Sequence, residues 1–325
     1  MGKRMRPHTL SVPKPLIPIA GKPIVQRLVA DIAKVCNTKI DNIGFIVGHF
    51  GEEAEKNLLA IAESVGATGQ IIYQEEALGT AHAILCAKEL LTGNVVVAYA
   101  DTLFKADFKL DTSKDAIIWV QKVENPSAFG VVKLNDKNEI TDFVEKPKTH
   151  ISDLAIIGIY YFKDGDNMRN ELQYLLDNDI RVGKEYQLTN ALENMKNKGI
   201  KFVPGQVDEW LDCGNKEATI QTNQRYLEYI KDTPLVATSA KITNSVIVPP
   251  VFIGENVVLE NSVIGPHVSV GNGTRIVGSV IRNAIIQENT VIENVNLVNS
   301  MIGNYAVIES EAKNLNVGDY NTMKV

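Results

Sequence analysis

The 325-residue sequence has an ordinary globular composition, with 45% hydrophobic and 22% charged residues and a formal net charge of −6 at pH 7. A negative net charge argues against a nucleic-acid-binding protein, whose affinity comes largely from neutralising phosphates. The apolar runs fall short of the roughly 18–20 residues that span a bilayer, and the three cysteines are too scattered for a disulfide framework. We therefore expect a cytoplasmic protein with neither nucleic-acid nor membrane partners, and the length predicts two domains.

The first eighteen residues, MGKRMRPHTLSVPKPLIP, contain five basic residues, counting His8, and four prolines. Prolines at this density disfavour a helix. A solvated tail and an arm that binds nucleic acid or membrane are two simple explanations for such a segment. In an acidic protein, a local basic cluster points instead to a small anionic ligand.

Residues 21–101 alternate between helical and strand patterns. Hydrophobic periodicity predicts helices over 21–35, 51–66 and 79–91, and apolar runs predict strands over 43–50, 70–74 and 95–101. Strands that alternate with helices imply a parallel sheet covered on both faces.

Residues 116–162 contain only strand patterns, over 116–123, 129–134, 139–145 and 154–162, which predicts a mixed extension of the sheet. Helices are predicted at about 165–178, 187–198 and 215–230. The segment KDTPL at 231–235 reads as a linker, so we predict a first domain over 1–232 and a second over 233–325.

The second domain contains aliphatic residues spaced five or six apart, with Gly-Asn and Glu-Asn turns between them. They stand at positions 247, 253, 259, 264, 270, 276, 281, 286, 292, 297, 302 and 308. Such a repeat is typical of a parallel β-helix, in which each aliphatic residue stacks on its equivalent one coil away. About eighteen residues per coil would give three to four coils.

Several motifs occur in a fixed order along the first 230 residues. They are GKRMRP and PKPLIP in the opening segment, QEEALGTAHA at 74–83, ADTLF at 100–104, AFGVVKL at 128–134, FVEKP at 143–147, IGIYYF at 157–162, EYQLTNAL at 185–192 and WLDCG at 210–214. In this order the chain resembles the sugar-1-phosphate nucleotidylyltransferases of the glucose-1-phosphate thymidylyltransferase and uridylyltransferase type. The resemblance implies an α/β, Rossmann-like nucleotidyltransferase domain with a mixed sheet, followed by a short left-handed parallel β-helix.

This resemblance implies an enzyme that joins a sugar 1-phosphate to the α-phosphate of a nucleoside triphosphate and releases pyrophosphate. Two polyanions must meet, so positioning and charge stabilisation dominate the catalysis. By resemblance, Gly2 belongs to the phosphate loop, Arg4 grips the β- and γ-phosphates, and Lys14 lies along the path of the α-phosphate. Asp101 and Asp212 match the two carboxylates that hold Mg²⁺.

Three further residues match the segment that recognises the nucleotide base: Gln74, Gly79 and Thr80. A glutamine amide offers one donor and one acceptor, which suits the edge of uracil or thymine. The resemblance therefore favours dTTP or UTP, and a GTP-using mannose-1-phosphate enzyme is the alternative.

The sugar-phosphate side is assigned to Gly130, Glu145, Lys146 and Gly158. By resemblance, Glu145 takes the sugar hydroxyls, with glucose 1-phosphate as the default substrate, and Lys146 takes the sugar's phosphate. The two glycines let the backbone approach the sugar. For Gly158, a strand glycine at a bulge is nearly as good an explanation.

The sequence also departs from the family pattern. Asn190 stands where the family has an aspartate, so no role is carried over to it. The family pattern begins with a hydrophobic strand at the centre of the sheet, and the sequence begins at what resembles the last glycine of the following loop. We expect that strand to be needed, because it would bury several aliphatic side chains at about 1.5–3 kcal/mol each.

The same patterns leave two alternative functions open and predict a homo-oligomer. The chain could be a non-catalytic regulatory or assembly relative, although Arg4, Lys14 and both aspartates are kept. His267 could match the catalytic histidine of hexapeptide acyltransferases, but a structural role is favoured. A short solenoid buries little surface alone, so we expect a homo-oligomer assembled through residues 240–312.

Overall fold

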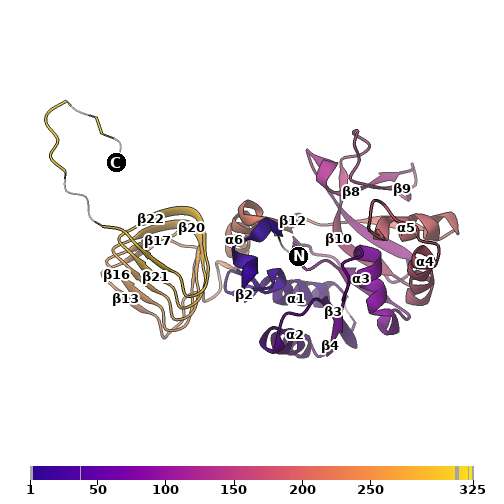
Figure 1. Cartoon of the computed structure of the whole chain (residues 1–325), viewed down its shortest axis with the longest axis horizontal. Helices are drawn as coiled ribbons and strands as arrows, with labels where there is room; N and C mark the ends of the chain where they lie inside the picture. The colour runs from indigo at the N-terminus through magenta and orange to yellow at the C-terminus, as the bar shows by residue number, and fades with distance from the viewer. Residues whose placement is uncertain (1–2, 37, 312–314, 321, 324–325) are drawn as a thin grey trace. The chain divides into compact units, whose positions relative to one another are not determined.

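The computed structural model describes residues 3–36, 38–311, 315–320 and 322–323. Contacts divide the chain into two compact units, drawn in Figure 1. Unit 1 comprises residues 1–17 and 23–214, and unit 2 comprises residues 18–22 and 215–325. Unit 1 is a mixed α/β domain and unit 2 contains a parallel β-solenoid, so the predicted fold class is confirmed.

Unit 1 begins with three 3₁₀ turns at Lys3–Met5, His8–Leu10 and Lys14–Leu16. Its α-helices are α1 (Ile24–Cys36), α2 (Glu52–Ser64), α3 (Thr80–Cys86), α4 (Gly165–Asp177) and α5 (Leu188–Asn197). Its strands are β3 (Asn42–Val47), β4 (Thr68–Tyr73), β5 (Val95–Ala98), β6 (Thr102–Lys105), β7 (Ala116–Lys122), β8 (Gly130–Leu134), β9 (Ile140–Glu145), β10 (Leu154–Phe162), β11 (Phe202–Gln206) and β12 (Glu209–Asp212). The helix predicted over 79–91 is shorter than expected, because α3 ends at Cys86 and a separate 3₁₀ turn covers Lys88–Leu90.

The main sheet of unit 1 is built around the nine-residue strand β10. Its strand order is β11-β7-β10-β8-β9, and β5 also pairs with β10. The pair β7–β11 is parallel, whereas β10 is antiparallel to β5, β7 and β8. The sheet is mixed, as the strand-only stretch at 116–162 predicts. A separate antiparallel pair, β6–β12, sets Thr102 opposite Asp212.

The strands β3 and β4 form a parallel pair of their own and do not join the main sheet within the described residues. A cavity of about 910 Å³ lies between this pair and β5. Its walls include Phe45 and Val47 from β3 and Val96 and Ala98 from β5. The expected central strand stays a prediction.

Unit 2 begins with the turn at residues 18–22, in which β1 (Pro18–Ile19) pairs with β2 (Lys22–Pro23). The helix α6 (Lys216–Ile230) and the solenoid complete the unit. The solenoid strands are β13 (Lys241–Thr243), β14 (Val246–Ile247), β15 (Val251–Ile253), β16 (Val258–Glu260), β17 (Val263–Ile264), β18 (Val268–Val270), β19 (Arg275–Val277), β20 (Val280–Ile286), β21 (Val291–Glu293), β22 (Asn296–Ile302) and β23 (Val307–Glu309). The predicted boundary at 232–233 stays a prediction, whereas the compact unit that contains the solenoid also includes α6.

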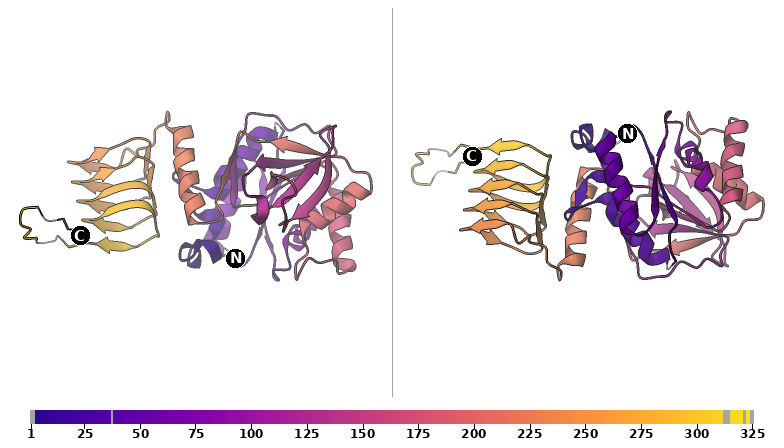
Figure 2. Two further views of the ribbon diagram at one scale, coloured as in Figure 1. Left: turned by 90° about the horizontal axis from the view of Figure 1, so that it is seen from above. Right: turned by 90° about the horizontal axis from the view of Figure 1, so that it is seen from below.

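The aliphatic repeat forms three stacked columns inside the solenoid, whose coils are seen edge-on in Figure 2. One column contains Ile247, Ile264, Ile281 and Leu297, which are joined by parallel pairing. Ile264 and Ile281 are fully buried. Successive members are 17, 17 and 16 residues apart, so the expected eighteen residues per coil is slightly too long. The predicted stacking is confirmed, and left-handedness stays a prediction.

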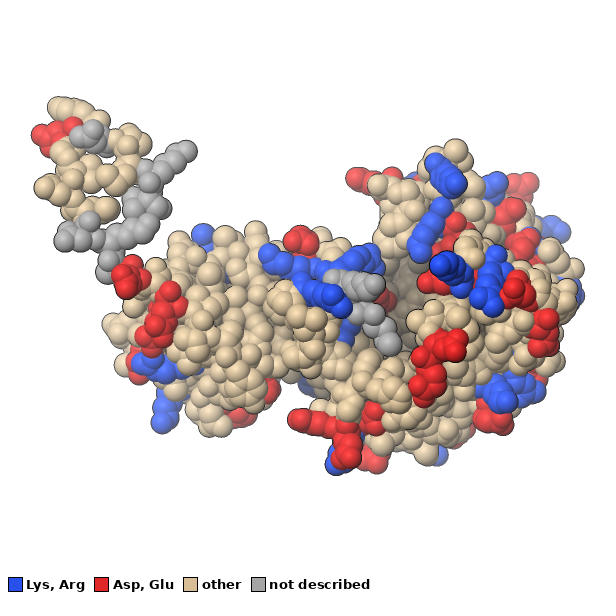
Figure 3. Space-filling view, in the orientation of Figure 1, with Lys and Arg blue, Asp and Glu red and all other residues tan. Residues whose placement is uncertain are grey.

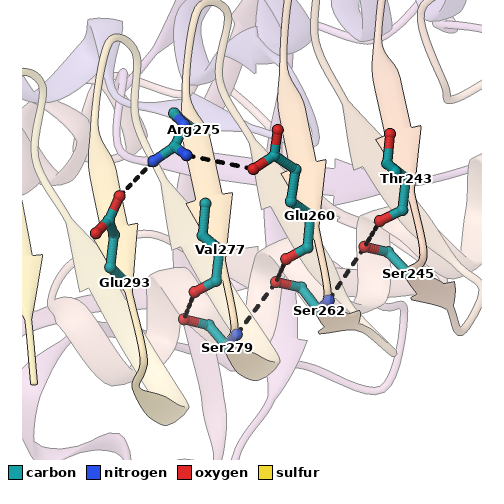
Figure 4. A network of polar contacts seen from close by, with 8 residues as sticks. All are labelled: Thr243, Ser245, Glu260, Ser262, Arg275, Val277, Ser279 and Glu293. Atoms are coloured by element: carbon teal, nitrogen blue, oxygen red, sulfur yellow. Dashed lines mark hydrogen bonds and ion pairs between the residues drawn. The ribbon is translucent and has the colours of Figure 1, made fainter. Parts of the chain in front are cut away.

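Polar ladders stabilise the turns of the solenoid (Figure 4). The backbone N–H of Ser262 donates to Ser245 Oγ at 3.1 Å, and that of Ser279 donates to Ser262 Oγ at 3.1 Å. On an outer face, the guanidinium of Arg275 contacts carboxylates from the neighbouring coils, Glu260 and Glu293. Each coil is therefore tied to the next by side chains as well as by backbone pairing.

No helix in the described part of the chain is long and apolar enough to cross a membrane.

Candidate active site

Four charged residues that are distant in the sequence meet in unit 1. Lys14 Nζ lies 2.7 Å from Asp101 Oδ2, and its side chain is only 15% exposed. The backbone N–H of Cys213 donates to the carbonyl of Asp101 at 2.9 Å, which brings Asp212 beside it. A Cβ placed on Gly214 would lie 3.4 Å from the Arg4 guanidinium and 2.9 Å from Asp212 Oδ1. The predicted phosphate-binding and metal-binding residues thus form one cluster.

The surroundings of Asp212 affect its pKa in both directions. Burial raises the pKa of Asp212, and the nearby Asp101 charge raises it further. The N–H of Gly214 donates to Asp212 Oδ1 at 2.9 Å, and this bond, together with Lys14 and Arg4, lowers the pKa of the carboxyl. Proteins often hold divalent cations with one or two carboxylates, and a metal site at Asp101 and Asp212 stays a prediction.

The predicted base-recognition residues lie together where β4 ends and α3 begins. The N–H of Gln74 donates to the carbonyl of Val47, and its side-chain Nε2 donates to the carbonyl of Gly79 at 3.1 Å. Gly79 has φ +111°, and a Cβ there would overlap the backbone of Tyr186, so only glycine fits. Thr80 Oγ1 accepts from the N–H of Leu188 at 3.0 Å. The turn is therefore fixed from both sides.

The predicted sugar-side residues lie on paired strands. Gly130 at the start of β8 stands opposite Glu145 at the end of β9, and a Cβ on Gly130 would lie 3.1 Å from Glu145 Oε2. Lys146 has φ +43° and is well exposed, and its Nζ lies 3.5 Å from Glu145 Oε1. The Glu-Lys pair thus lies beside Gly130, and Glu145, Ile156 and Thr189 line the space that a side chain at Gly130 would need. Contact of these residues with a sugar stays a prediction.

Gly158 is explained by packing. It has φ +85° and lies in the register shift of β10, between Ile156 and Tyr160. A Cβ there would lie 2.9 Å from the ring of Tyr99, whose N–H donates to the Gly158 carbonyl at 2.8 Å. The bulge that the sequence offered as an alternative is present. A contact between Gly158 and the sugar stays a prediction.

Sequence reasoning missed Tyr99, which lies at the centre of these groups. Burial raises the pKa of Tyr99 to about 12, hydrogen bonds with Thr80 and Tyr160 lower it, and charges on Glu145 and Asp101 raise it again. Tyr99 thus contacts the predicted base-recognition residue Thr80, and Asp101 and Glu145 are close enough for their charges to change its pKa. Its signal in the sequence was its position two residues before Asp101, at the end of a buried strand.

Three other polar residues near the site were also missed. Thr189 is buried, its Oγ1 has no hydrogen-bond partner among the described residues, and its methyl group would lie 3.7 Å from a Cβ on Gly130. His82 Nδ1 lies 3.1 Å from Gln74 Nε2. Gln187 Oε1 accepts from Thr80 Oγ1 at 3.3 Å. Gly2 lies outside the described residues.

Comparison with known proteins gives the relationship that this geometry suggests. The profile of the nucleotidyl transferase family matches residues 1–229, which include every residue of the site. The chain belongs to the nucleotidyl transferase family. The surface of the molecule is hollowed next to its N-terminal segment, with lysine and arginine side chains nearby (Figure 3).

Several curated proteins are related to this chain. A low-salt glycan biosynthesis nucleotidyltransferase of Haloferax volcanii is 31% identical over 235 residues, which are 70% of this chain and 64% of that protein. The bifunctional protein GlmU of Methanococcus maripaludis is 31% identical over 263 residues, with 80% of this chain and 59% of that protein covered. A glucose-1-phosphate thymidylyltransferase of Streptomyces antibioticus is 28% identical and covers 100% of this chain and 97% of its own. The chain thus matches less than two thirds of the first two relatives' length.

Solved structures share the fold of the first part of this chain. A UDP-glucose pyrophosphorylase complexed with UDP-glucose superposes with a TM-score of 0.57 at 23% identity, over 70% of this chain and 95% of that one. A putative glucose-1-phosphate thymidylyltransferase from Bacillus anthracis gives the same TM-score at 22% identity, over 68% and 89%. At this identity the likeness establishes the fold.

Proposed function

We propose that this protein transfers a nucleotidyl group from a nucleoside triphosphate to a sugar 1-phosphate and releases pyrophosphate. The observation that carries the proposal is the convergence of Arg4, Lys14, Asp101 and Asp212 within a nucleotidyl transferase domain. Two cations and two carboxylates suit a reaction in which triphosphate charge must be held and shifted. The relative of matching length, a glucose-1-phosphate thymidylyltransferase, supports glucose 1-phosphate as the sugar substrate.

In this reaction a phosphate oxygen of the sugar 1-phosphate attacks the α-phosphorus of the nucleotide. The new P–O bond forms as the bond to the bridging oxygen of the β-phosphate breaks, and pyrophosphate leaves with that electron pair. Lys14 would leave Asp101 and stabilise the α-phosphate, while Arg4 would stabilise the leaving pyrophosphate. Because neither residue is a nucleophile, their contribution is positioning and charge.

We propose that Mg²⁺ is the cofactor and that Asp101 and Asp212 hold it. The donor set fits, since Mg²⁺ prefers one or two carboxylates together with substrate phosphates and water. When bound, the ion would neutralise charge on the phosphate oxygens. Before the substrates bind, the ion pair between Lys14 and Asp101 balances the charges of these two side chains. The nucleotide phosphate would then take over Lys14, and the cation would take over Asp101.

The remaining site residues divide between the two substrates. Gln74, with Gly79 and Thr80 behind it, would read the base, and dTTP and UTP are favoured over GTP because the amide suits a pyrimidine edge. Glu145 would accept hydrogen bonds from sugar hydroxyls and Lys146 would bind the sugar's phosphate. The exposure of Lys146 leaves it free to turn toward an arriving anion.

The direct test is pyrophosphate release by the purified chain with Mg²⁺ and glucose 1-phosphate, with dTTP, UTP and GTP supplied in separate reactions. We expect release with dTTP or UTP to exceed release with GTP at least about tenfold. Faster release with GTP would overturn the base preference. The absence of release with every nucleotide, also with mannose 1-phosphate as the acceptor, would overturn the activity.

We also propose a cytoplasmic enzyme that forms a homo-oligomer through the solenoid. Val246, Val263 and Val280 form one outward column, and Val246 is 58% exposed. A second copy would cover this apolar column. Light scattering of the full chain should give more than one protomer at micromolar concentration, and a Val246→Lys/Val280→Lys variant should shift to the monomer. A monomeric parent chain would contradict the proposal.

A further inference from the structure

The turn at residues 18–22 lies in unit 2, although it follows the loop that contains Lys14. Ile19 and Ala20 are almost completely buried, with 0% and 2% exposure. Ala20 has φ +47°, a conformation that a non-glycine residue keeps only when its surroundings hold it there. The contacts around this turn therefore need an explanation.

Asn223 on α6 accepts a hydrogen bond from the turn. Its side chain is fully buried, and its Oδ1 accepts from the N–H of Ala20 at 2.8 Å and from Ser269 Oγ at 2.7 Å. One amide oxygen thus joins the turn, the helix α6 and the solenoid strand β18. Loss of this oxygen would leave a buried N–H without its acceptor.

The ring of Phe252 on β15 packs against the same turn. Gly21 has φ +85°, and a Cβ placed there would overlap the Phe252 ring, so the ring lies directly against the glycine. Phe252 stands beside Ser269 in the parallel ladder, on the face of the solenoid that also includes Ile285. Ile285 is fully buried, and α6 packs against β18, β20 and β22 of that face.

The chain between the turn and Lys14 is short and stiff. Prolines at 13, 15 and 18 each fix a backbone dihedral. The N–H of Leu16 donates to Pro13 O at 2.8 Å, and the N–H of Ile17 donates to Lys14 O at 3.1 Å. A displacement at Ala20 is therefore passed on to Lys14, because few free rotations lie between them.

We propose that Asn223 and Phe252 are positioning residues for Lys14, because they hold the turn at residues 18–22 and residues 15–17 join that turn to Lys14. The inference rests on the proposed function for the role of Lys14. The anchoring of residues 14–20 does not rest on the proposed function. The anchoring and its effect on catalysis can both be measured in the full chain.

The first measurement is amide hydrogen exchange at Leu16 and Ile17 in the Asn223→Ala variant. We expect exchange to rise at least about tenfold, because the anchor of the loop is lost. The matched control is Ile292→Ala, which removes a fully buried solenoid side chain outside the turn's contacts and should leave these two amides unchanged. Equal exchange in wild type and Asn223→Ala, or an equal rise in the control, would overturn the proposal.

The second measurement is steady-state kinetics of Phe252→Ala, Phe252→Leu and Asn223→Ala. We expect kcat to fall about tenfold to a hundredfold in both alanine variants, since a small misplacement of a reacting group costs this much. KM for the sugar 1-phosphate should stay within about twofold, because the sugar-side residues are untouched, and Phe252→Leu should recover part of kcat. Wild-type kcat in both alanine variants would overturn the proposal.

The two measurements also separate this proposal from the proposed function. If the wild type releases no pyrophosphate, the proposed function fails, and hydrogen exchange alone decides whether the turn is anchored as inferred. If an alanine variant does not fold, the milder Phe252→Leu variant carries both measurements. Its loop exchange should then lie above wild type, and wild-type exchange would contradict the anchoring.

Discussion

The solenoid and the α/β unit hold their strands together in different ways. In the solenoid, partners such as Ile264 and Ile281 are 17 residues apart, and each coil repeats the contacts of the previous one. In unit 1, partners such as Ile117 and Val203 are brought together over a much longer stretch of chain. Repetition gives a stable scaffold in which a side chain meets groups of the neighbouring coils, as Arg275 meets Glu260 and Glu293. The long-range pairing of unit 1 is what brings unlike charges such as Lys14 and Asp101 into contact.

The largest expected effect concerns the charged cluster. Asp101→Asn should lower the rate of pyrophosphate release by about 10²–10³-fold, because charge compensation at the phosphates is lost. The fold should persist, so circular dichroism and the melting temperature should stay close to wild type. Asp136→Asn, at an exposed turn of the same unit, is the control and should keep full activity. Wild-type turnover in Asp101→Asn would remove this residue from the site.

A smaller effect is expected in the solenoid. Ile276→Val deletes one methylene group from a fully buried column and should cost about 1 kcal/mol of unfolding free energy. Ile253 is also fully buried, and a complete coil lies between it and Ile276, so Ile276→Val and Ile253→Val should add in the double variant. Denaturant unfolding followed in all three variants checks this. A strongly non-additive loss would show that the solenoid is as interdependent as unit 1.

The smallest effect concerns the pair on α6 and the solenoid. His267 Nε2 lies 2.7 Å from Glu228 Oε1, and this hydrogen bond, with help from Lys231, lowers the pKa of Glu228 below its ordinary 4.5. The pair therefore stabilises the folded state above pH 4.5, and the contribution is lost as pH falls through the lowered pKa. Glu228→Gln should melt slightly below wild type at pH 7, and the difference should vanish in acid. A difference that persists in acid would mean that the carboxylate's charge does not matter.

Much of the fold could be predicted because local patterns determine it. The twelve aliphatic positions of the repeat include residues such as Ile253, Leu259 and Ile276, all fully buried, since the period alone places them inside. The strands of 116–162 were found from their β-branched runs and turns. The coil length was overestimated because a five-residue spacing recurs among the six-residue ones.

The sequence predicted only those site residues that belong to recognisable motifs. Arg4, Lys14, Asp101 and Asp212 belong to recognisable segments, and the structure brings them together. Tyr99 and Asn223 were missed because their importance comes from neighbours far along the chain. A tyrosine near the end of an apolar strand or an asparagine inside a helix carries no local mark of such contacts.

The path of the chain through unit 2 has a consequence for biosynthesis. Residues 18–22 are made early, whereas Asn223, which holds Ala20, follows 203 residues later. At about 5–20 residues per second, the turn waits roughly 10–40 s before its partner has been synthesised. The loop that contains Lys14 thus leaves the ribosome well before the residue that holds the turn after it. Until α6 has been synthesised, the Oδ1 atom that accepts from the N–H of Ala20 is absent.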